Sequence, residues 1–156
     1  MKRIFLLVLL SLLFTSCGST NSTTKTKTNS KSESIVNYAK SFDGTSYKFG
    51  GTTTKGMDCS GLVYVSFKKE DIILPRISRD MAKKGKRIPL NKTQKGDLVF
   101  FKTDKNRNVI NHVGLVVEID KGEVYFIHST TRRGVIISSL KERYWRDAFV
   151  EVRSII

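Results

Sequence analysis

Cysteine and histidine are both scarce in this sequence, with two of each among 156 residues. The cysteines are Cys17 and Cys59, and the histidines are His112 and His128. Few residues of this chain can therefore supply a catalytic thiol or imidazole. The spacings between Cys59 and the two histidines match no common zinc pattern, which argues against a metal site built from these three residues.

The sequence also lacks an N-terminal apolar run long enough to span a bilayer. Residues 4–14 are apolar apart from Ser11, but about 20 such residues are needed. A basic start, this short run and the small residues that follow are typical of a secretory signal. Cys17 comes directly after the small residues, which resembles a lipoprotein signal. We predict a signal peptide over residues 1–16 and lipidation of Cys17; an ordinary signal peptide cut nearby is the alternative.

Apolar residues are also absent from residues 18–32, which are almost entirely Ser, Thr, Asn and Lys. Together with Cys17 they predict a disordered tether over residues 17–32, with a reach of about 20 Å. If Cys17 is lipidated, Cys59 has no partner in the chain. A lone cysteine in an exported protein indicates a reactive thiol or an intermolecular pair. Residues 33–156 are expected to form one domain.

Acidic residues are few, since 14 Asp and Glu face 28 Lys and Arg, for a formal net charge of +14. Such a balance favours polyanions or acidic surfaces as partners. Because the chain carries an export signal, we expect cell-wall carboxylates and anionic envelope glycans rather than nucleic acid. The predicted anchor places the protein in the cell envelope, on a membrane that we expect to be the outer membrane facing the periplasm. We expect a monomer.

The apolar pattern of the remaining chain predicts helices first and strands later. Helices are expected from residue 32 or 34 to 42, over 59–69 and over 78–84. Strands are expected over residues 98–101, 111–119, 123–128, 135–138 and 149–155. Helices followed by antiparallel strands make an α+β domain.

Cys59 begins a predicted helix, with Asp58 at the N-cap position. The backbone N–H groups and the dipole at a helix start favour an anion, so we expect a depressed pKa for the Cys59 thiol. A cysteine nucleophile also needs a base within hydrogen-bond reach, and that base needs a third group to fix its tautomer. His112 and His128 are the candidates for these two roles.

The register of one predicted hairpin decides whether the two histidines can meet. A three-residue loop over residues 120–122 would place His128 opposite Gly114 and diagonal to His112, on the same face of the sheet. A two-residue loop over 121–122 would put the two rings on opposite faces. The catalytic interpretation therefore requires the first register, in which the small Gly114 leaves room for both rings.

Five sequence blocks, taken together, resemble a known family. The segment MDCSGLV (residues 57–63) resembles the nucleophile motif of the NlpC/p60 family of cell-wall cysteine peptidases. The family's other blocks resemble YKFGG (47–51), LPR (74–76), GDLVFF (96–101) and HVG (112–114), in the same order. The resemblance covers residues 35–152. It implies a papain-like cysteine peptidase fold, with N-terminal helices packed on a central antiparallel sheet of five or six strands, and makes 33–156 a catalytic domain.

The resemblance implies a role for each matching residue. Cys59 matches the nucleophile, His112 the general base, and His128 the third polar residue that orients the imidazole. Tyr47 matches a tyrosine whose hydroxyl helps to stabilise the oxyanion. Asp58 and Ser60 match positions that can hold the free amine of a stem-peptide L-alanine. For Tyr47 the alternative is core packing, and for Asp58 it is a plain N-cap.

The expected function is hydrolysis of peptidoglycan stem peptides by a cysteine endopeptidase, at the bond between γ-D-glutamate and the next diamino acid. No cofactor and no metal are expected. Three alternatives remain open from the sequence. They are an inactive lipoprotein that only binds wall peptides, a metal site formed by the cysteine and the two histidines, and an amidase or acyltransferase on the same papain-like fold.

Overall fold

The structure, a computed structural model, describes residues 21–156, with side chains from Ser30 onward. The expected signal peptide (1–16) and the lipidation site Cys17 lie outside the described residues. The helical elements are α1 (Asn21–Lys40), α2 (Cys59–Lys68), α3 (Ser78–Met81), a 3-10 turn (Leu90–Lys92) and α4 (Arg143–Ala148). The strands are β1 (Thr52–Thr53), β2 (Gly56–Met57), β3 (Lys86–Ile88), β4 (Leu98–Phe101), β5 (His112–Asp120), β6 (Glu123–Thr130), β7 (Gly134–Ser139) and β8 (Phe149–Ser154). The α+β class is confirmed.

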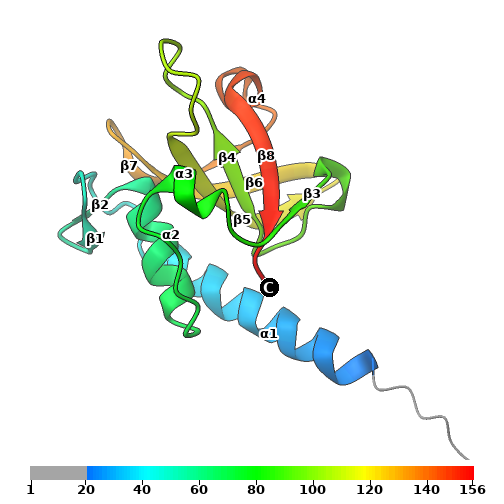
Figure 1. The fold of residues 1–156 in the computed structure, drawn as a ribbon. Coiled ribbons are helices and arrows are strands. Elements are labelled where there is room, and N and C mark those ends of the chain that lie inside the picture. Colours follow the sequence, from blue (N-terminus) through cyan, green and yellow to red (C-terminus); the bar gives the residue numbers. More distant parts are fainter. Residues whose placement is uncertain (1–20) are drawn as a thin grey trace, which may run out of the picture.

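Six of the strands form one antiparallel sheet in the order β3-β8-β4-β5-β6-β7 (Figure 1). Alternate residues of the central strands point to opposite faces, and both faces are buried. One face packs against α1 and α2, and its core includes Val36, Leu62, Phe100 and Leu115. The other face packs against the α4 segment around Trp145. The expected arrangement of N-terminal helices on a five- or six-stranded sheet is confirmed.

Helix α1 begins at Asn21, earlier than the sequence predicted. The disordered tether expected over residues 17–32 therefore differs from the structure over 21–32, which is helical. The packed part of α1 is the one that the sequence identified, since Ile35, Val36 and Ala39 are fully buried. Once such a turn is fixed by packing, each further helical residue adds one backbone hydrogen bond without a new nucleation cost, which extends the helix into polar sequence. Within the described residues no helix is both long and apolar enough to cross a membrane.

The hairpin between β5 and β6 combines the two registers that the sequence left open. Its turn is the two-residue Lys121–Gly122, with positive φ at both positions, and not the three-residue loop that the catalytic interpretation required. A β-bulge at Val117 then inserts one extra residue into β5. Leu115 is consequently opposite Ile127, which is the register that brings the histidines to one face.

Gly114 leaves room for a ring other than the two imidazoles that were expected there. A Cβ at this position would lie 2.4 Å from Cδ2 of Phe126. The glycine therefore makes room for the phenylalanine that packs beneath His128, at a ring distance of 4.8 Å, rather than for the two imidazoles.

Several small elements escaped the sequence-based prediction, among them the 3-10 turn Leu90–Lys92. Strand β3 is an exposed, charged edge strand that pairs with β8, so it lacks the apolar alternation of a buried strand. Helix α4 has six residues, fewer than two helical turns, which is too short for a periodic pattern. The β1–β2 hairpin has two residues in each strand.

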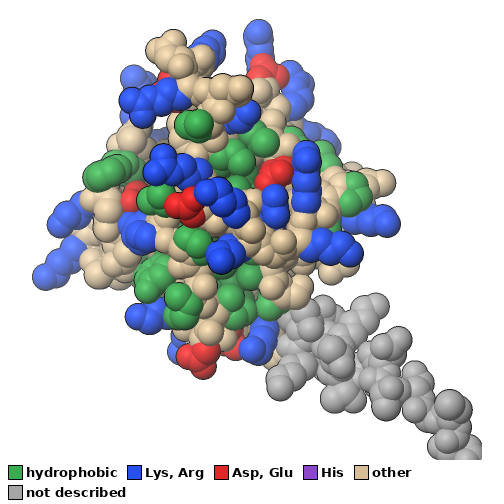
Figure 2. Space-filling view, in the orientation of Figure 1, with side chains coloured by type: hydrophobic (Ala, Val, Ile, Leu, Met, Phe, Trp, Pro, Cys, Tyr) green, Lys and Arg blue, Asp and Glu red, His purple; other side chains and the backbone are tan. Residues whose placement is uncertain are grey.

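Basic side chains outnumber acidic ones on the face drawn in Figure 2. Figure 2 shows Lys and Arg spread over the whole drawn face, with few acidic side chains between them. This distribution agrees with the formal net charge of +14.

Candidate active site

The thiol of Cys59 lies at the first residue of α2 because Asp58 caps that helix. The Asp58 carboxylate accepts hydrogen bonds from the backbone N–H of Gly61 (2.6 Å) and of Gly50 (2.7 Å). The segment before the helix is tied to the sheet, since Ser129 Oγ donates to the Met57 carbonyl at 2.8 Å. These bonds fix the start of α2 against the strand that carries His128.

Burial raises the pKa of the Cys59 thiol, so the expected depressed pKa is wrong for the free protein. The nearby Asp58 carboxylate adds to the rise. Backbone hydrogen bonds from Val113, Ser60 and Cys59 itself act in the opposite direction but do not overcome the loss of solvation. The helix start therefore holds a neutral thiol, whose proton must be removed when it reacts.

The two histidines form a hydrogen-bonded chain that ends on a serine. His112 Nε2 lies 3.0 Å from His128 Nδ1, and His128 Nε2 lies 3.0 Å from Ser138 Oγ. His128 is fully buried and Ser138 is nearly so. Burial lowers the pKa of His112 to about 4. Burial, His112 and Arg133 together lower the pKa of His128 to about 2. Both imidazoles are therefore neutral at physiological pH.

Trp145 of α4 holds the imidazole chain from the side. Its indole stacks on His112 at a ring distance of 5.2 Å and an interplanar angle of 22°. The same indole meets His128 edge to face at 4.5 Å. Because Trp145 is itself nearly buried, it restricts the rotation of both rings.

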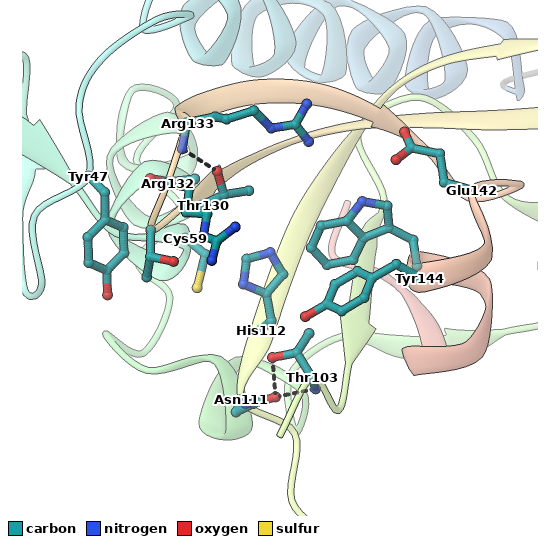
Figure 3. A pocket seen from close by; sticks show the side chains of 13 residues that line it. Tyr47, Cys59, Thr103, Asn111, His112, Thr130, Arg132, Arg133, Glu142 and Tyr144 are labelled. Carbon is teal, nitrogen blue, oxygen red and sulfur yellow. Dashed lines mark hydrogen bonds between the residues drawn. The ribbon is translucent and has the colours of Figure 1, made fainter. Parts of the chain in front are cut away.

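Cys59, His112, Trp145 and Tyr47 line one pocket of about 610 Å³. In Figure 3 the sulfur of Cys59 and the ring of His112 point toward each other inside this pocket, and Tyr47 lies on the far side of Cys59 from His112. The segment of Tyr47 is held by a bridge to Met57, two residues before the thiol. Burial, and then the neighbouring Asp58 carboxylate, raise the pKa of the Tyr47 phenol, which keeps its proton available for donation.

Asp58 and Ser60 are engaged within the protein. Arg76 donates to both carboxylate oxygens of Asp58 at 2.9 Å each, and to Ser60 Oγ at 2.9 Å. Burial opposes ionisation of Asp58, but the Arg76 guanidinium and the backbone N–H donors hold the pKa of its carboxyl below the usual value. The N-cap role of Asp58 is thus evident in the structure, and binding of a substrate amine by Asp58 and Ser60 stays a prediction.

Sequence reasoning missed Ser138, Trp145 and the partners of Arg76. Ser138 belongs to a short strand of ordinary composition, and its role depends on the β6–β7 register, which places it opposite Phe126 and within reach of His128. Trp145 was the single tryptophan of the chain, which could have served as a signal. Within residues 21–156 no group of three or more His, Cys, Asp or Glu side chains is arranged to hold a metal ion.

The profile described as the NlpC/P60 family matches residues 44–154. The chain belongs to the NlpC/P60 family. One relative is the "Probable endopeptidase NlpC" of Escherichia coli (strain K12), 41% identical over 74% of this chain and 73% of the relative. A solved NlpC/P60 family protein from Bacillus cereus superposes with a TM-score of 0.72 at 30% identity, over 80% of this chain and 40% of that one. The papain-like fold implied by the resemblance is confirmed.

Two further relatives carry names that specify a bond. The Escherichia coli "Murein DD-endopeptidase MepS/Murein LD-carboxypeptidase" is 35% identical over 81% of this chain and 63% of its own length. The Bacillus subtilis "Gamma-D-glutamyl-L-lysine dipeptidyl-peptidase" is 36% identical over 78% of this chain and 40% of its own length. This chain spans less than two thirds of either protein. The names describe different bonds, so the family alone does not select one.

Proposed function

We propose that this NlpC/P60 protein is a cysteine peptidase that hydrolyses peptidoglycan stem peptides, with Cys59 as nucleophile and His112 as general base. The observation that carries the proposal is the pocket in which the Cys59 thiol faces an imidazole whose second nitrogen is held by His128. The names of the relatives support a peptidase of this class.

The tautomers of the two hydrogen-bonded histidines determine which nitrogen of His112 can act as the base. His112 Nε2 is engaged with His128, so its Nδ1 is the nitrogen left for the thiol. A neutral His112 with a free Nδ1 must carry its proton on Nε2 and donate it to His128 Nδ1. His128 must then carry its proton on Nε2 and donate it to Ser138 Oγ. In this arrangement Ser138 positions the base through His128.

Catalysis would proceed by general-base activation, since the resting pair is a neutral thiol and a neutral imidazole. His112 takes the Cys59 proton as the sulfur attacks the amide carbonyl. The oxyanion is stabilised by the Tyr47 hydroxyl and the Cys59 backbone N–H. The imidazolium of His112 then protonates the leaving amine, the C–N bond breaks, and a thioester remains. A water molecule, deprotonated by His112, hydrolyses the thioester and restores the thiol.

We propose the bond between γ-D-glutamate and the following diamino acid as the site of cleavage. The name of the Bacillus subtilis relative supports this bond, whereas the name of the MepS relative favours the D-alanyl cross-link or a terminal residue. Purified stem peptides and cross-linked dimers should be incubated with the protein and with Cys59→Ala, and the fragments identified by mass spectrometry. Fragments that end in γ-D-glutamate, made by the wild type alone, are expected; cleavage at D-alanine would contradict the bond.

Two alternatives, an amidase or acyltransferase and an inactive binding protein, give other results once glycan-linked stem peptides and a free amine are added to the assay. An amidase would release stem peptides from the glycan strands, and an acyltransferase would form new amides with the added amine. A binding protein without activity would leave all peptides intact, although all three positions of the Cys–His–His set are filled. Lipid anchoring through Cys17 and placement in the cell envelope stay predictions.

A further inference from the structure

The turn between β6 and β7 holds two arginines at the mouth of the candidate site. Arg132 and Arg133 line the same pocket as Cys59 and His112. Figure 3 shows Arg132 on the side of Cys59 and the side chain of Arg133 extending from the turn in the direction of Glu142.

The turn is fixed in place by its backbone. The N–H of Arg133 donates to Thr130 Oγ1 at 3.1 Å. Gly134 follows with φ of 68°, and a Cβ there would lie 2.2 Å from the carbonyl oxygen of Thr45. This close approach docks the turn against the segment that leads to Tyr47. The two arginines therefore project from a positioned support.

Neither guanidinium has an acidic partner in the described part of the chain. Ion pairs there involve other cations, such as Arg76, Arg87 and Arg153. Glu142 is the carboxylate among the pocket-lining residues, and its side chain accepts a hydrogen bond from the backbone N–H of Ser139 at 2.9 Å. Two positive charges at the pocket mouth thus stand against the single negative charge of Glu142.

The position of these charges indicates which half of a substrate they would meet. His112 must hand its proton to the leaving amine, so groups around His112 face the leaving half of the peptide. The charge of Arg133 acts on the buried ring of His128 directly behind His112. A planar guanidinium prefers a carboxylate, which it can bind through two parallel hydrogen bonds.

We infer that Arg132 and Arg133 form a carboxylate-binding subsite for the leaving residue, so that the enzyme prefers substrates whose leaving diamino acid carries free carboxylates. This inference rests on the proposed peptidase function and specifies its substrate class. Both arginines are exposed, so water and salt screen the interaction. We expect a preference of about tenfold rather than an absolute requirement.

The test compares two tripeptides, L-alanyl-γ-D-glutamyl-diaminopimelate with both diaminopimelate carboxylates free, and the same peptide with both converted to carboxamides. The two substrates are nearly isosteric and differ in charge. Wild-type kcat/KM should be about tenfold higher for the acid, and the ratio should shrink as NaCl is raised. The double variant Arg132→Gln/Arg133→Gln should cleave both peptides with a ratio below about twofold. Arg79→Gln, an exposed arginine outside the pocket, should retain the wild-type ratio.

The possible outcomes distinguish failure of the arginine subsite from failure of the proposed peptidase function. Equal cleavage of both tripeptides by the wild type, or an unchanged ratio in the double variant, would overturn the subsite while leaving the peptidase intact. If the wild type cleaves neither tripeptide, the proposed function itself fails, and the subsite fails with it. Circular dichroism of each variant establishes that a lost preference is not a loss of fold.

Discussion

Acid should destabilise this fold through its two histidines, of which His128 is fully buried and His112 partly buried. Burial holds the pKa of His112 at about 4 and that of His128 at about 2, against an ordinary value of 6.5. As the pH falls below 6.5, the histidines of the unfolded chain therefore bind protons, whereas those of the folded chain stay unprotonated. The contribution of the two neutral histidines to the free energy of unfolding is fully present above pH 6.5. It is lost progressively as the pH falls from 6.5 to the pKa values of the folded protein.

The size of the effect at pH 5 depends mainly on the unfolded state. At pH 5 both imidazoles of the folded protein are still neutral. The same pH lies about 1.5 units below the pKa of a histidine in the unfolded chain. At ~1.4 kcal/mol per unit, each histidine lowers the free energy of unfolding by about 2 kcal/mol relative to pH 7.5. The two together account for about 4 kcal/mol, a large share of the stability of an ordinary domain.

Urea denaturation at pH 7.5 and pH 5 measures this loss, with the fluorescence of Trp145 and far-UV circular dichroism as parallel probes. His128→Gln removes one titrating ring and keeps a hydrogen-bonding side chain. Its unfolding free energy should fall by about 2 kcal/mol less than that of the wild type between the two pH values. Each protein supplies its own reference at pH 7.5, so a general destabilisation cancels. An equal fall in both proteins would refute the argument.

Three further predictions concern the site. Gly61→Ala should destabilise the protein by about 2–4 kcal/mol in urea titrations, because the new Cβ would lie 2.0 Å from the carbonyl oxygen of Gly51; wild-type stability would contradict this packing. Ser138→Ala should lower kcat about tenfold with little change in KM, since the His128 tautomer loses its acceptor, and Ser138→Thr should restore it. Iodoacetamide should modify Cys59 with a midpoint above pH ~8.5, the value for an exposed thiol, and a lower midpoint would contradict the effect of burial.

Much of the fold followed from local patterns. The start of α2 could be predicted because Asp58 is a strong N-cap residue followed by an amphipathic helix. The strands β4 and β5 could be predicted because buried strands in a two-sided core are rich in apolar residues. The pairing of His112 with His128 followed from strand parity once a register was assumed.

What could not be predicted depends on contacts between distant segments. The bulge at Val117 has no local sequence signal, yet it determines that the histidines share a face. The pKa of Cys59 was predicted from the helix dipole alone, and burial by the surrounding fold reversed its direction. The engagement of Asp58 by Arg76 joins residues far apart in the chain. Each of these is a tertiary effect that a local pattern does not contain.

In the proposed mechanism the sulfur of Cys59 bonds to the substrate during turnover. Acid-quenching the enzyme within the first turnover of a stem peptide, followed by mass spectrometry of the digested protein, would detect this bond. We expect a thioester adduct on the peptide that contains Cys59, with the mass of the acyl half of the substrate, and this adduct should disappear as product forms. Full turnover by Cys59→Ala, or an adduct on a different residue, would contradict this mechanism.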